Sequence, residues 1–600
     1  MAGDGGLNSR QASLDLGLVG NGGSAALIDA HARVVWGCVP AIDGDPTFCA
    51  LLSPKIGGGD FAIELEDMVS AEQHYVQNTA VLRTVLRDRH GGAVEITDFA
   101  PRWRQHGRFY RPVMLVRRLR PLAGKPRVRI VLRPLGDYGA TVPDTTWGSN
   151  HVRYLVPGFT LRLTSDVPVR MVRESLPFVL DGERNLVLGP DETLTEPVDD
   201  FARQAEERTI HYWREWVRYL SIPLEWQDAV IRSAITLKLC QYEETGAIVA
   251  ALTTSIPEAP DTVRNWDYRY CWLRDSAFVV RALNRLGATR TMEGYLSYVF
   301  NLATGDDDLQ PLYGVGFESE LTEEEVPALA GYRGMGPVRR GNLAWKQVQH
   351  DVYGSVVLAS TQLFFDQRLD HPGDEDAFHR LEALGERAHA MYDQPDAGIW
   401  EFRGRAEVHT YSSVMCWAAC DRLARIAAHI GLVPRAEYWR TRADTMHAAI
   451  IERAWDAELG HFVESAEGRR LDASLLLLAE LGFVAADDPR FVATVDAIGV
   501  HLRRGDGLYR YIAPDDFGHP ETSFTICSFW YIEALAAIGR TDEARRQFEQ
   551  LLARRNPLGL LSEDMAFEDG EAWGNFPQTY SHVGVVMAAM CLSKPWSSAV

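Results

Sequence analysis

The first third of the chain alternates between apolar and polar residues. Between about Leu14 and Pro197, short segments with a period of two recur, and Gly, Pro, Asp and Asn residues separate them. This pattern predicts antiparallel strands with one buried and one solvent-facing side, as in a β-sandwich. The segments are AALIDAHARVVWGCV, AVEITDFAP, VMLVRRLRPL, RVRIVLRPL, FTLRLTSDVPVRMV and LPFVLDGERNLVLG.

The period changes to that of a helix near DDFARQAEERTIHYWREWVRYL, and long helical segments follow to the end of the chain. A chain of 600 residues also exceeds what one hydrophobic core usually organises. We therefore predict an N-terminal antiparallel β-sandwich domain over residues 1–205, a helical linker over 206–225 and an all-helical domain over 226–600.

The helical segments are of two kinds. SLLLLAELGF and TICSFWYIEALAAI are apolar on most faces, whereas RAEYWRTRADTMHAA has one narrow apolar stripe. A helix surrounded by protein needs the first pattern, and a helix that faces water needs the second. Their alternation predicts an inner ring of helices inside an outer ring. A solenoid of stacked helical hairpins is the alternative, but no repeat of fixed period supports it.

Charge and composition narrow the classes of partner. The net charge of −21 argues against a nucleic-acid partner and against a polybasic membrane contact, and it is compatible with a neutral substrate. No leader-like start and no apolar run of membrane-spanning length occur, so we expect a cytoplasmic protein. None of the eight cysteines lies in a CxxC pair; Cys416 and Cys420 share a helix face, which favours packing over zinc binding.

Three segments combine polar and aromatic residues in a way that suggests chemistry. The first is NWDYRYCWLRDSAF, residues 265–278. An ordinary helix cap would account for Asp275 and Ser276, but not for Trp272 and Arg274 beside them. An Arg–Asp pair between aromatic side chains suits a sugar, because sugar hydroxyls both donate and accept hydrogen bonds.

The other two segments each contain a candidate carboxylate. In DAGIWEFRG, Glu401 follows Ile399 and Trp400, and an apolar wall there would favour the protonated carboxyl that a general acid needs. In LLSEDMAFEDGEAWGNFPQTYSHVG, Glu563 follows an apolar run. From the residues alone, an ordinary solvated loop is the better explanation of the segment with Glu401 and at least as good an explanation of the segment with Glu563.

The residues alone leave the choice of carboxylate open in the last segment, where Asp564, Glu568 and Glu571 compete with Glu563. A carboxylate pair is nevertheless the chemistry to pursue. No GxSxG elbow, Walker loop, HExxH or dinucleotide fingerprint occurs in the context that each of these motifs requires.

Across these segments the sequence resembles glycoside hydrolase family 15, the glucoamylase and bacterial trehalase family, over nearly the whole chain. The resemblance implies a multidomain fold in which an N-terminal β-sandwich of the supersandwich type precedes an (α/α)6 barrel with the site in its funnel. The motifs that carry it, in order, are LGLVGNGGSAALIDAHARVVWGCVPAIDGDPTFCALL, NWDYRYCWLRDS, GYRGMGPVRRGN with DVYGSVV, GIWEFRG, LDASLLLL, SFTICSFWYIEAL, and LLSED with GNFPQTYSHVG.

The resemblance also implies an inverting mechanism. Glu401 matches the general acid and Glu563 the general base, and the two carboxyl groups are then expected to lie roughly 6.5–9.5 Å apart, which leaves room for a water molecule. No metal or organic cofactor is implied, and a dependence on phosphate or Mg²⁺ is left open, as is self-association into a homo-oligomer. The residues that match substrate-binding positions are Trp272, Arg274, Asp275, Trp400 and Arg403.

Two departures from the family pattern concern the substrate. Ser413 stands where members often have Lys, in Ser412-Ser413-Val414-Met415, and an acidic insert GFESELTEEEVPALA occupies residues 316–330 in place of a Gly-Ile-Asp-Gly form. Both are expected near the leaving group. The implied activity is exo-acting hydrolysis of an α-glucoside with release of β-glucose, and trehalose is the favoured substrate. The alternatives are malto- or isomalto-oligosaccharides, a sugar phosphorylase and a non-catalytic sugar-binding protein.

Overall fold

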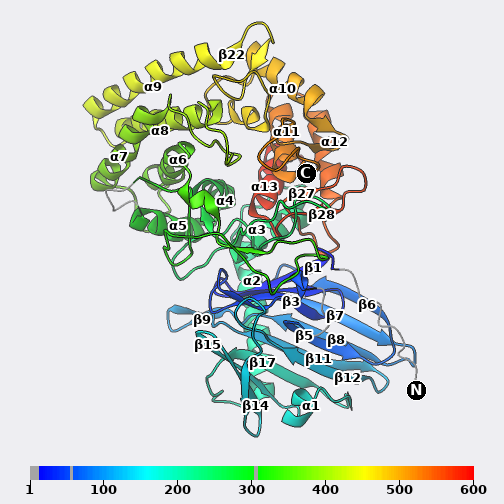
Figure 1. Cartoon of the computed structure of the whole chain (residues 1–600). Coiled ribbons are helices and arrows are strands. Elements are labelled where there is room, and N and C mark those ends of the chain that lie inside the picture. Colours follow the sequence, from blue (N-terminus) through cyan, green and yellow to red (C-terminus); the bar gives the residue numbers. More distant parts are fainter. Residues whose placement is uncertain (1–11, 54–57, 303–307, 600) are drawn as a thin grey trace.

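The computed structural model describes residues 12–53, 58–302 and 308–599. The expectation about a leader rests partly on residues 1–11, which lie outside the described part. Figure 1 shows two halves: antiparallel sheets built by the first third of the chain, and helices built by the rest. This is the predicted order of a sheet domain followed by a helical domain.

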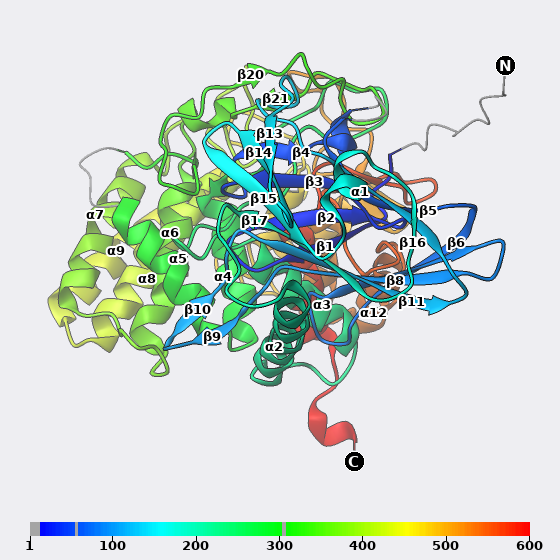
Figure 2. The ribbon, with the colours of Figure 1, turned by 90° about the horizontal axis from the view of Figure 1, so that it is seen from below.

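Two antiparallel sheets form the N-terminal half (Figure 2). Neighbours along the seven-stranded sheet are β1 (Leu16–Gly20), β2 (Ala25–Asp29), β3 (Arg33–Val39), β5 (Asp60–Leu65), β12 (Arg127–Arg133) and β16 (Phe178–Val179), with β4 (Asp45–Phe48) paired to β3. Neighbours along the eight-stranded sheet are β13 (Asp144–Trp147), β14 (His151–Val156), β15 (Phe159–Ser165), β17 (Arg184–Pro190), β11 (Leu115–Ala123), β8 (Ala93–Phe99), β7 (Leu82–Asp88) and β6 (Met68–Tyr75).

Apolar residues from both sheets meet in one core, as the period of two predicts. Phe61 and Ile130 of the first sheet share a buried cluster with Ile96 and Leu119 of the second. One predicted strand is shorter than expected. In FTLRLTSDVPVRMV, β15 ends at Ser165 and the helix α1 (Val169–Arg173) follows Pro168, a residue that is tolerated at a helix start because it needs no N–H there.

Helix α2 (Val198–Arg218) joins the two halves and lies beside the hairpin of β9 (Trp103–Gln105) and β10 (Arg108–Tyr110) (Figures 1 and 2). Its first turns bury Phe201 against the eight-stranded sheet, whereas Trp213 belongs to the core of the helical half. The predicted domain limits at residues 205 and 225 stay predictions.

The helical half contains most of the α-helices of the described residues. They are α3 (Gln227–Leu239), α4 (Leu273–Arg285), α5 (Thr289–Leu302), α6 (Asp351–Phe365), α7 (Glu375–Met391), α8 (Thr410–His429), α9 (Val433–Ala454), α10 (Pro489–His501), α11 (Thr525–Ala537), α12 (Thr541–Leu552) and α13 (Thr579–Leu592). The 3-10 helices of the chain are η1 (Ala50–Leu52), η2 (Leu343–Lys346), η3 (Ala473–Leu477) and η4 (Trp596–Ala599).

Contacts between the helices run in a closed circuit. They lead from α4 to α6, from α6 to α8, through η3 to α11, and through α13 back to α4. Helices α5, α7, α9, α10 and α12 pack against members of this circuit, and α9 buries only one stripe that includes Trp439 and Met446. The segment SLLLLAELGF, predicted as a helix, forms only the short η3, although Leu475, Leu476 and Leu477 are buried as its composition predicts.

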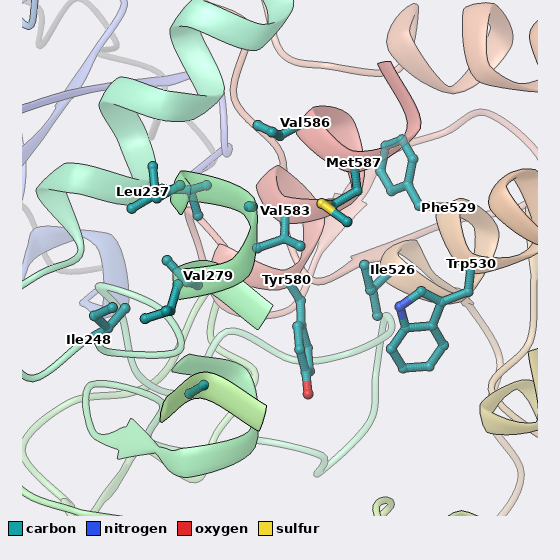
Figure 3. Close-up of a cluster of buried hydrophobic side chains, with 14 of the residues drawn as sticks. Leu237, Ile248, Val279, Ile526, Phe529, Trp530, Tyr580, Val583, Val586 and Met587 are labelled. Carbon is teal, nitrogen blue, oxygen red and sulfur yellow. The ribbon is translucent and has the colours of Figure 1, made fainter. Parts of the chain in front are cut away.

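Figure 3 shows part of the core of the circuit. Leu237 of α3, Val279 of α4, Phe529 of α11 and Val583 of α13 point toward one another. Helix α13 is buried along most of its length, in agreement with its lack of a polar face. Tyr580, in its first turn, extends away from these apolar residues (Figure 3) and lines a cavity.

Short strands connect the helices at the end of the circuit where this cavity lies. β18 (Cys271–Trp272), which directly precedes α4, pairs with β19 (Leu312–Tyr313). β26 (Ser523–Phe524), which directly precedes α11, forms a sheet with β27 (Asp564–Met565) and β28 (Ala572–Trp573), which lie between α12 and α13. They fix loops that would otherwise be irregular. The remaining pairs are β20 (Glu324–Glu325) with β21 (Arg339–Arg340), β22 (Trp455–Asp456) with β23 (His461–Phe462), and β24 (Arg503–Arg504) with β25 (Gly507–Leu508).

Candidate active site

All three segments singled out in the sequence contribute to one cavity. The space inside it, including the part that is open to solvent, is about 880 Å³. Every residue predicted to act there lines it, namely Trp272, Arg274, Asp275, Trp400, Glu401, Arg403 and Glu563. The fold therefore brings together residues that are nearly 300 positions apart in the chain.

Glu401 sits on a tight turn in the segment between α7 and α8. Its backbone lies in the left-handed region, with φ of 60°, a strained conformation for a residue with a side chain. The turn is anchored from behind: the buried carboxylate of Asp396 accepts hydrogen bonds from the N–H of His350 (2.8 Å), the N–H of Gly398 (3.2 Å) and the hydroxyl of Ser412 (2.7 Å). Burial raises the pKa of Asp396 to about 7.

The carboxylate of Glu401 is surrounded differently from the sequence prediction. Its Oε1 accepts hydrogen bonds from the indole N–H of Trp272 (2.7 Å), the guanidinium of Arg274 (3.3 Å) and the amide of Gln349 (3.3 Å). Ile399 and Trp400, from which the apolar wall was expected, also line the cavity, but the hydrogen-bond partners of this oxygen are all N–H groups. About 21% of the Glu401 side chain remains exposed.

Arg274 and Asp275 lie in the first turn of α4, directly after β18. Arg274 is buried and donates to Gln349 (2.8 Å) and to Asp351 (3.1 Å), in addition to Glu401. Burial raises the pKa of Asp275 to about 7, the guanidinium of Arg274 opposes that rise, and the charge of Glu401 adds to it. The cavity thus contains an acid that titrates near neutrality beside a fixed cation.

Glu563 is almost completely buried, at 1% exposure. Its backbone is held by Asn575 and by Thr525 at the start of α11. Its Oε2 accepts the N–H of Asn575 (3.2 Å), whereas Oε1 has no hydrogen-bond partner among the described residues. Gly574, with φ of 71°, makes this approach possible, since a Cβ there would lie 2.7 Å from Oε2 of Glu563.

The surroundings of Glu563 disfavour its charge. Burial raises the pKa of Glu563 well above its ordinary value, and the neighbouring carboxyl of Asp564 adds to that rise, while Arg510 opposes it. The structure also separates the carboxylates that the sequence left open. Of Glu563, Asp564, Glu568 and Glu571, Glu563 alone lines the cavity in the part of the chain that is described.

Further lining residues were missed by the sequence analysis. Arg510 donates to the buried Glu258 (2.7 Å), which also accepts the indole N–H of Trp266 (2.9 Å). Arg264 forms a bidentate pair with Asp515 (2.9 and 2.7 Å). The segment LYRYIAPDDF has the same mixture of aromatic, Arg and Asp residues as residues 265–278, and that signal could have found it.

The two departures from the family pattern lie outside the cavity lining. The hydroxyl of Ser413 donates to the carbonyl of Tyr392 (2.6 Å) and accepts from Arg453 (3.2 Å), behind the Glu401 turn. None of residues 316–330 lines the cavity within the described chain, but Glu323 of the insert reaches Arg403 at its edge.

Two kinds of feature are absent from the described residues. No group of three or more His, Cys, Asp or Glu residues is placed to hold a metal ion. No helix has the length and apolar composition needed to cross a membrane.

Two carboxyl groups in one cavity are the catalytic groups that most glycoside hydrolases use. The comparisons with known proteins agree: the chain is a glycoside hydrolase. It belongs to glycosyl hydrolases family 15, whose model matches residues 226–590. A second model, trehalase-like N-terminal, matches residues 10–155.

Two relatives are similar along nearly the whole chain. A trehalase of Mycobacterium tuberculosis is 34% identical over 94% of this chain and 87% of its own length. A trehalase of Thermoplasma volcanium is 31% identical over 96% of this chain and 92% of its own length. A bacterial glucoamylase, solved in complex with acarbose, matches 99% of this chain and 96% of its own with a TM-score of 0.69 at 14% identity. This similarity confirms a glucoamylase-like fold, with an N-terminal antiparallel sheet domain and a helical C-terminal domain.

Proposed function

We propose that the chain is an inverting, exo-acting α-glucoside hydrolase that releases β-glucose and has trehalose as its favoured substrate. The observation that carries this proposal is that Glu401 and Glu563 line the same cavity. The names of the two trehalase relatives support trehalose over other α-glucosides.

The roles of the two carboxyl groups are those that the resemblance to the family implies, and the position of both groups in the cavity lining supports them. Glu401, partly exposed and held by three N–H donors, is the general acid that protonates the glycosidic oxygen. Glu563 is the general base, since its unpartnered Oε1 can accept a hydrogen bond from the attacking water. Its raised pKa makes the ionised carboxylate a stronger base.

Inversion requires that water attack from the face of the sugar opposite to the leaving group. The two carboxyl groups are therefore expected to be separated by roughly 6.5–9.5 Å, the range typical of inverting enzymes. The bond from the anomeric carbon to the glycosidic oxygen breaks as Glu401 gives up its proton, and the water gives its proton to Glu563 as the new carbon–oxygen bond forms.

The substrate-binding residues hold the terminal glucose in this proposal. Arg274 and Asp275 bind its hydroxyls at the buried end of the cavity, Trp272 and Trp400 flank the ring, and Arg403 binds nearer the opening. Such contacts raise the rate only where they strengthen at the oxocarbenium-like transition state.

The finer description of the fold is part of the same proposal. We assign the closed circuit of helices to an (α/α)6 barrel over residues 226–600, preceded by a supersandwich over 1–205 and a linker over 206–225. The circuit supports this assignment because its members alternate in sequence with helices packed outside it. The cytoplasmic location, the lack of a cofactor and any homo-oligomer stay predictions.

The test is glucose release from trehalose, maltose, isomaltose and maltotriose, with the anomer followed by NMR. Early β-glucose from trehalose is the expected result. Early α-glucose would contradict inversion, and a preference for maltose or isomaltose would contradict trehalose. Release of glucose 1-phosphate only in the presence of phosphate would identify a phosphorylase, and no release from any sugar would contradict hydrolysis.

A further inference from the structure

The acidic insert is joined to the cavity by one bidentate ion pair. The guanidinium of Arg403 donates to Oε1 of Glu323 (3.1 Å) and to Oε2 (2.8 Å), while the backbone N–H of Arg403 donates to Asp516 (2.7 Å). Glu323 is only 15% exposed and also accepts the N–H of Leu343 (3.1 Å). Arg403 is therefore held from two sides, although no other residue of the insert touches it through a polar contact in the described chain.

The ion pair orients the guanidinium against an aromatic wall. The guanidinium carbon of Arg403 lies 4.6 Å from the ring centre of Trp266 and 5.4 Å from that of Phe517, and both aromatic residues line the cavity. A guanidinium has five N–H groups, of which the pair with Glu323 uses two. The other three have no partner among the described residues and are available to a ligand.

Burial along the cavity shows which part of a substrate would meet this guanidinium. Only 5% of the Arg274 side chain and 9% of the Asp275 side chain are exposed, whereas 26% of the Arg403 side chain is exposed. Glu401, at 21%, lies two residues from Arg403 in sequence. With the terminal ring at the buried end and Glu401 at the bond to be cleaved, the second ring of a disaccharide lies toward Arg403.

We propose that Glu323 is a positioning residue for the leaving group: its carboxylate fixes the guanidinium of Arg403 beside Trp266, where the free N–H groups of Arg403 bind hydroxyls of the second sugar ring. This inference rests on the proposed function. Through the pair of Glu323 and Arg403, the acidic insert contributes to substrate choice, since a substrate without a second ring makes no contact with Arg403.

The test compares two substrates of the same enzyme. Trehalose, or whichever disaccharide the unmodified enzyme prefers, has a second ring, and α-glucosyl fluoride has none. Glu323→Gln keeps the size of the side chain but weakens the pair. We expect kcat/KM to fall about tenfold or more on the disaccharide, mainly through KM, and to change less than about twofold on the fluoride.

The adjacent Glu324 supplies a matched control, because it pairs with the exposed Arg340 away from the cavity lining. Glu324→Gln is expected to act on both substrates like the unmodified enzyme. In a double-mutant cycle, Arg403→Gln is expected to add little to Glu323→Gln on the disaccharide, since both variants remove the pair between these two residues. Glu323→Gln also weakens the longer contact of Glu323 with Arg339 (3.7 Å), which does not line the cavity.

The outcomes separate this inference from the proposed function. If the unmodified enzyme hydrolyses neither substrate, the proposed function fails. If it hydrolyses the disaccharide and Glu323→Gln does so equally well, or loses activity to the same extent on both substrates, only the positioning role fails. A shift in the basic limb of the pH profile on the disaccharide would indicate a disturbed Glu401 turn and would also overturn the role.

Discussion

Glu401 and Glu563 carry the same functional group in opposite surroundings. Glu401 lies on a partly exposed turn where three N–H groups converge on one oxygen, whereas Glu563 is buried, with one N–H donor and an oxygen that has no partner. The pKa of Glu563 is raised by that burial. The fold thus gives one residue type two different environments in one cavity, and the proposed mechanism assigns opposite proton transfers to the two groups.

Removing each carboxylate tests the comparison most severely. Glu563→Gln is expected to reduce kcat about 10²–10⁴-fold on both trehalose and α-glucosyl fluoride, because both need an activated water. Glu401→Gln is expected to do so on trehalose and much less on the fluoride, since fluoride leaves with little help from an acid. Steady-state kinetics on the two substrates measure both effects. Equal losses for the two variants on the fluoride would contradict the assignment of roles.

One of the N–H groups that donate to Glu401 can be removed while an aromatic ring is kept in the wall of the cavity. Trp272→Phe removes the donor at 2.7 Å but keeps an aromatic ring, and kcat/KM on trehalose is expected to fall about tenfold. Trp573→Phe is the control, because the indole N–H of Trp573 is buried without an acceptor among the described residues. The role of the Trp272 N–H would be refuted if the two variants had equal activity.

The charge beside Glu563 should set the acidic limb of the pH profile. As general base, Glu563 must be ionised, so activity is lost as the pH falls through its raised pKa, at a higher pH than for an ordinary glutamate. Asp564→Asn removes one cause of that rise and is expected to move the acidic limb of kcat/KM to lower pH. Glu568→Gln, an exposed change in the same segment, should leave the limb in place. A shift to higher pH in Asp564→Asn would be the contrary result.

The smallest expected effect concerns the turn that carries Glu401. Gly398 has φ of 67°, and a Cβ there would lie 2.7 Å from the ring of His409. Gly398→Ala is expected to lower stability by about 2 kcal/mol and kcat/KM about fivefold. Gly460→Ala, at φ of 72° with open space around it, is expected to lower the free energy of unfolding by about 1 kcal/mol and to leave the activity unchanged. Thermal unfolding and kinetics of both variants check this, and unchanged activity in Gly398→Ala would show that the turn tolerates the strain.

Local patterns predicted most of the fold, because each strand or helix shows its period within about ten residues. The 3-10 helix η3 shows the limit: Leu475, Leu476 and Leu477 are buried as predicted, but composition does not determine whether an apolar run continues as an α-helix. The division into a sandwich and a helical half is visible in the sequence as a change in the period of the hydrophobic residues. The closed circuit of helices depends instead on contacts between helices that are far apart in the chain.

The site residues could be predicted where they belong to a sequence motif, but not where only tertiary contacts bring them together. Both Glu563 and Asp564 are buried, and only the lining of the cavity distinguishes them, which a row of neighbouring acids in the sequence does not show. The N–H groups on Glu401 come from Trp272 and Gln349, which lie 129 and 52 positions away, so the polar surroundings of that carboxylate could not be read from its neighbours in sequence.

Helix α2 has a consequence for how the molecule unfolds. Phe201 near its start belongs to one apolar cluster and Trp213 near its end to another, and Trp36 of the first sheet donates its indole N–H to the carbonyl of Leu252 in the helical half (2.7 Å). Melting this one helix would uncover apolar surface on both sides at once. The sandwich and the helical half are therefore expected to lose their structure cooperatively, as one thermodynamic unit.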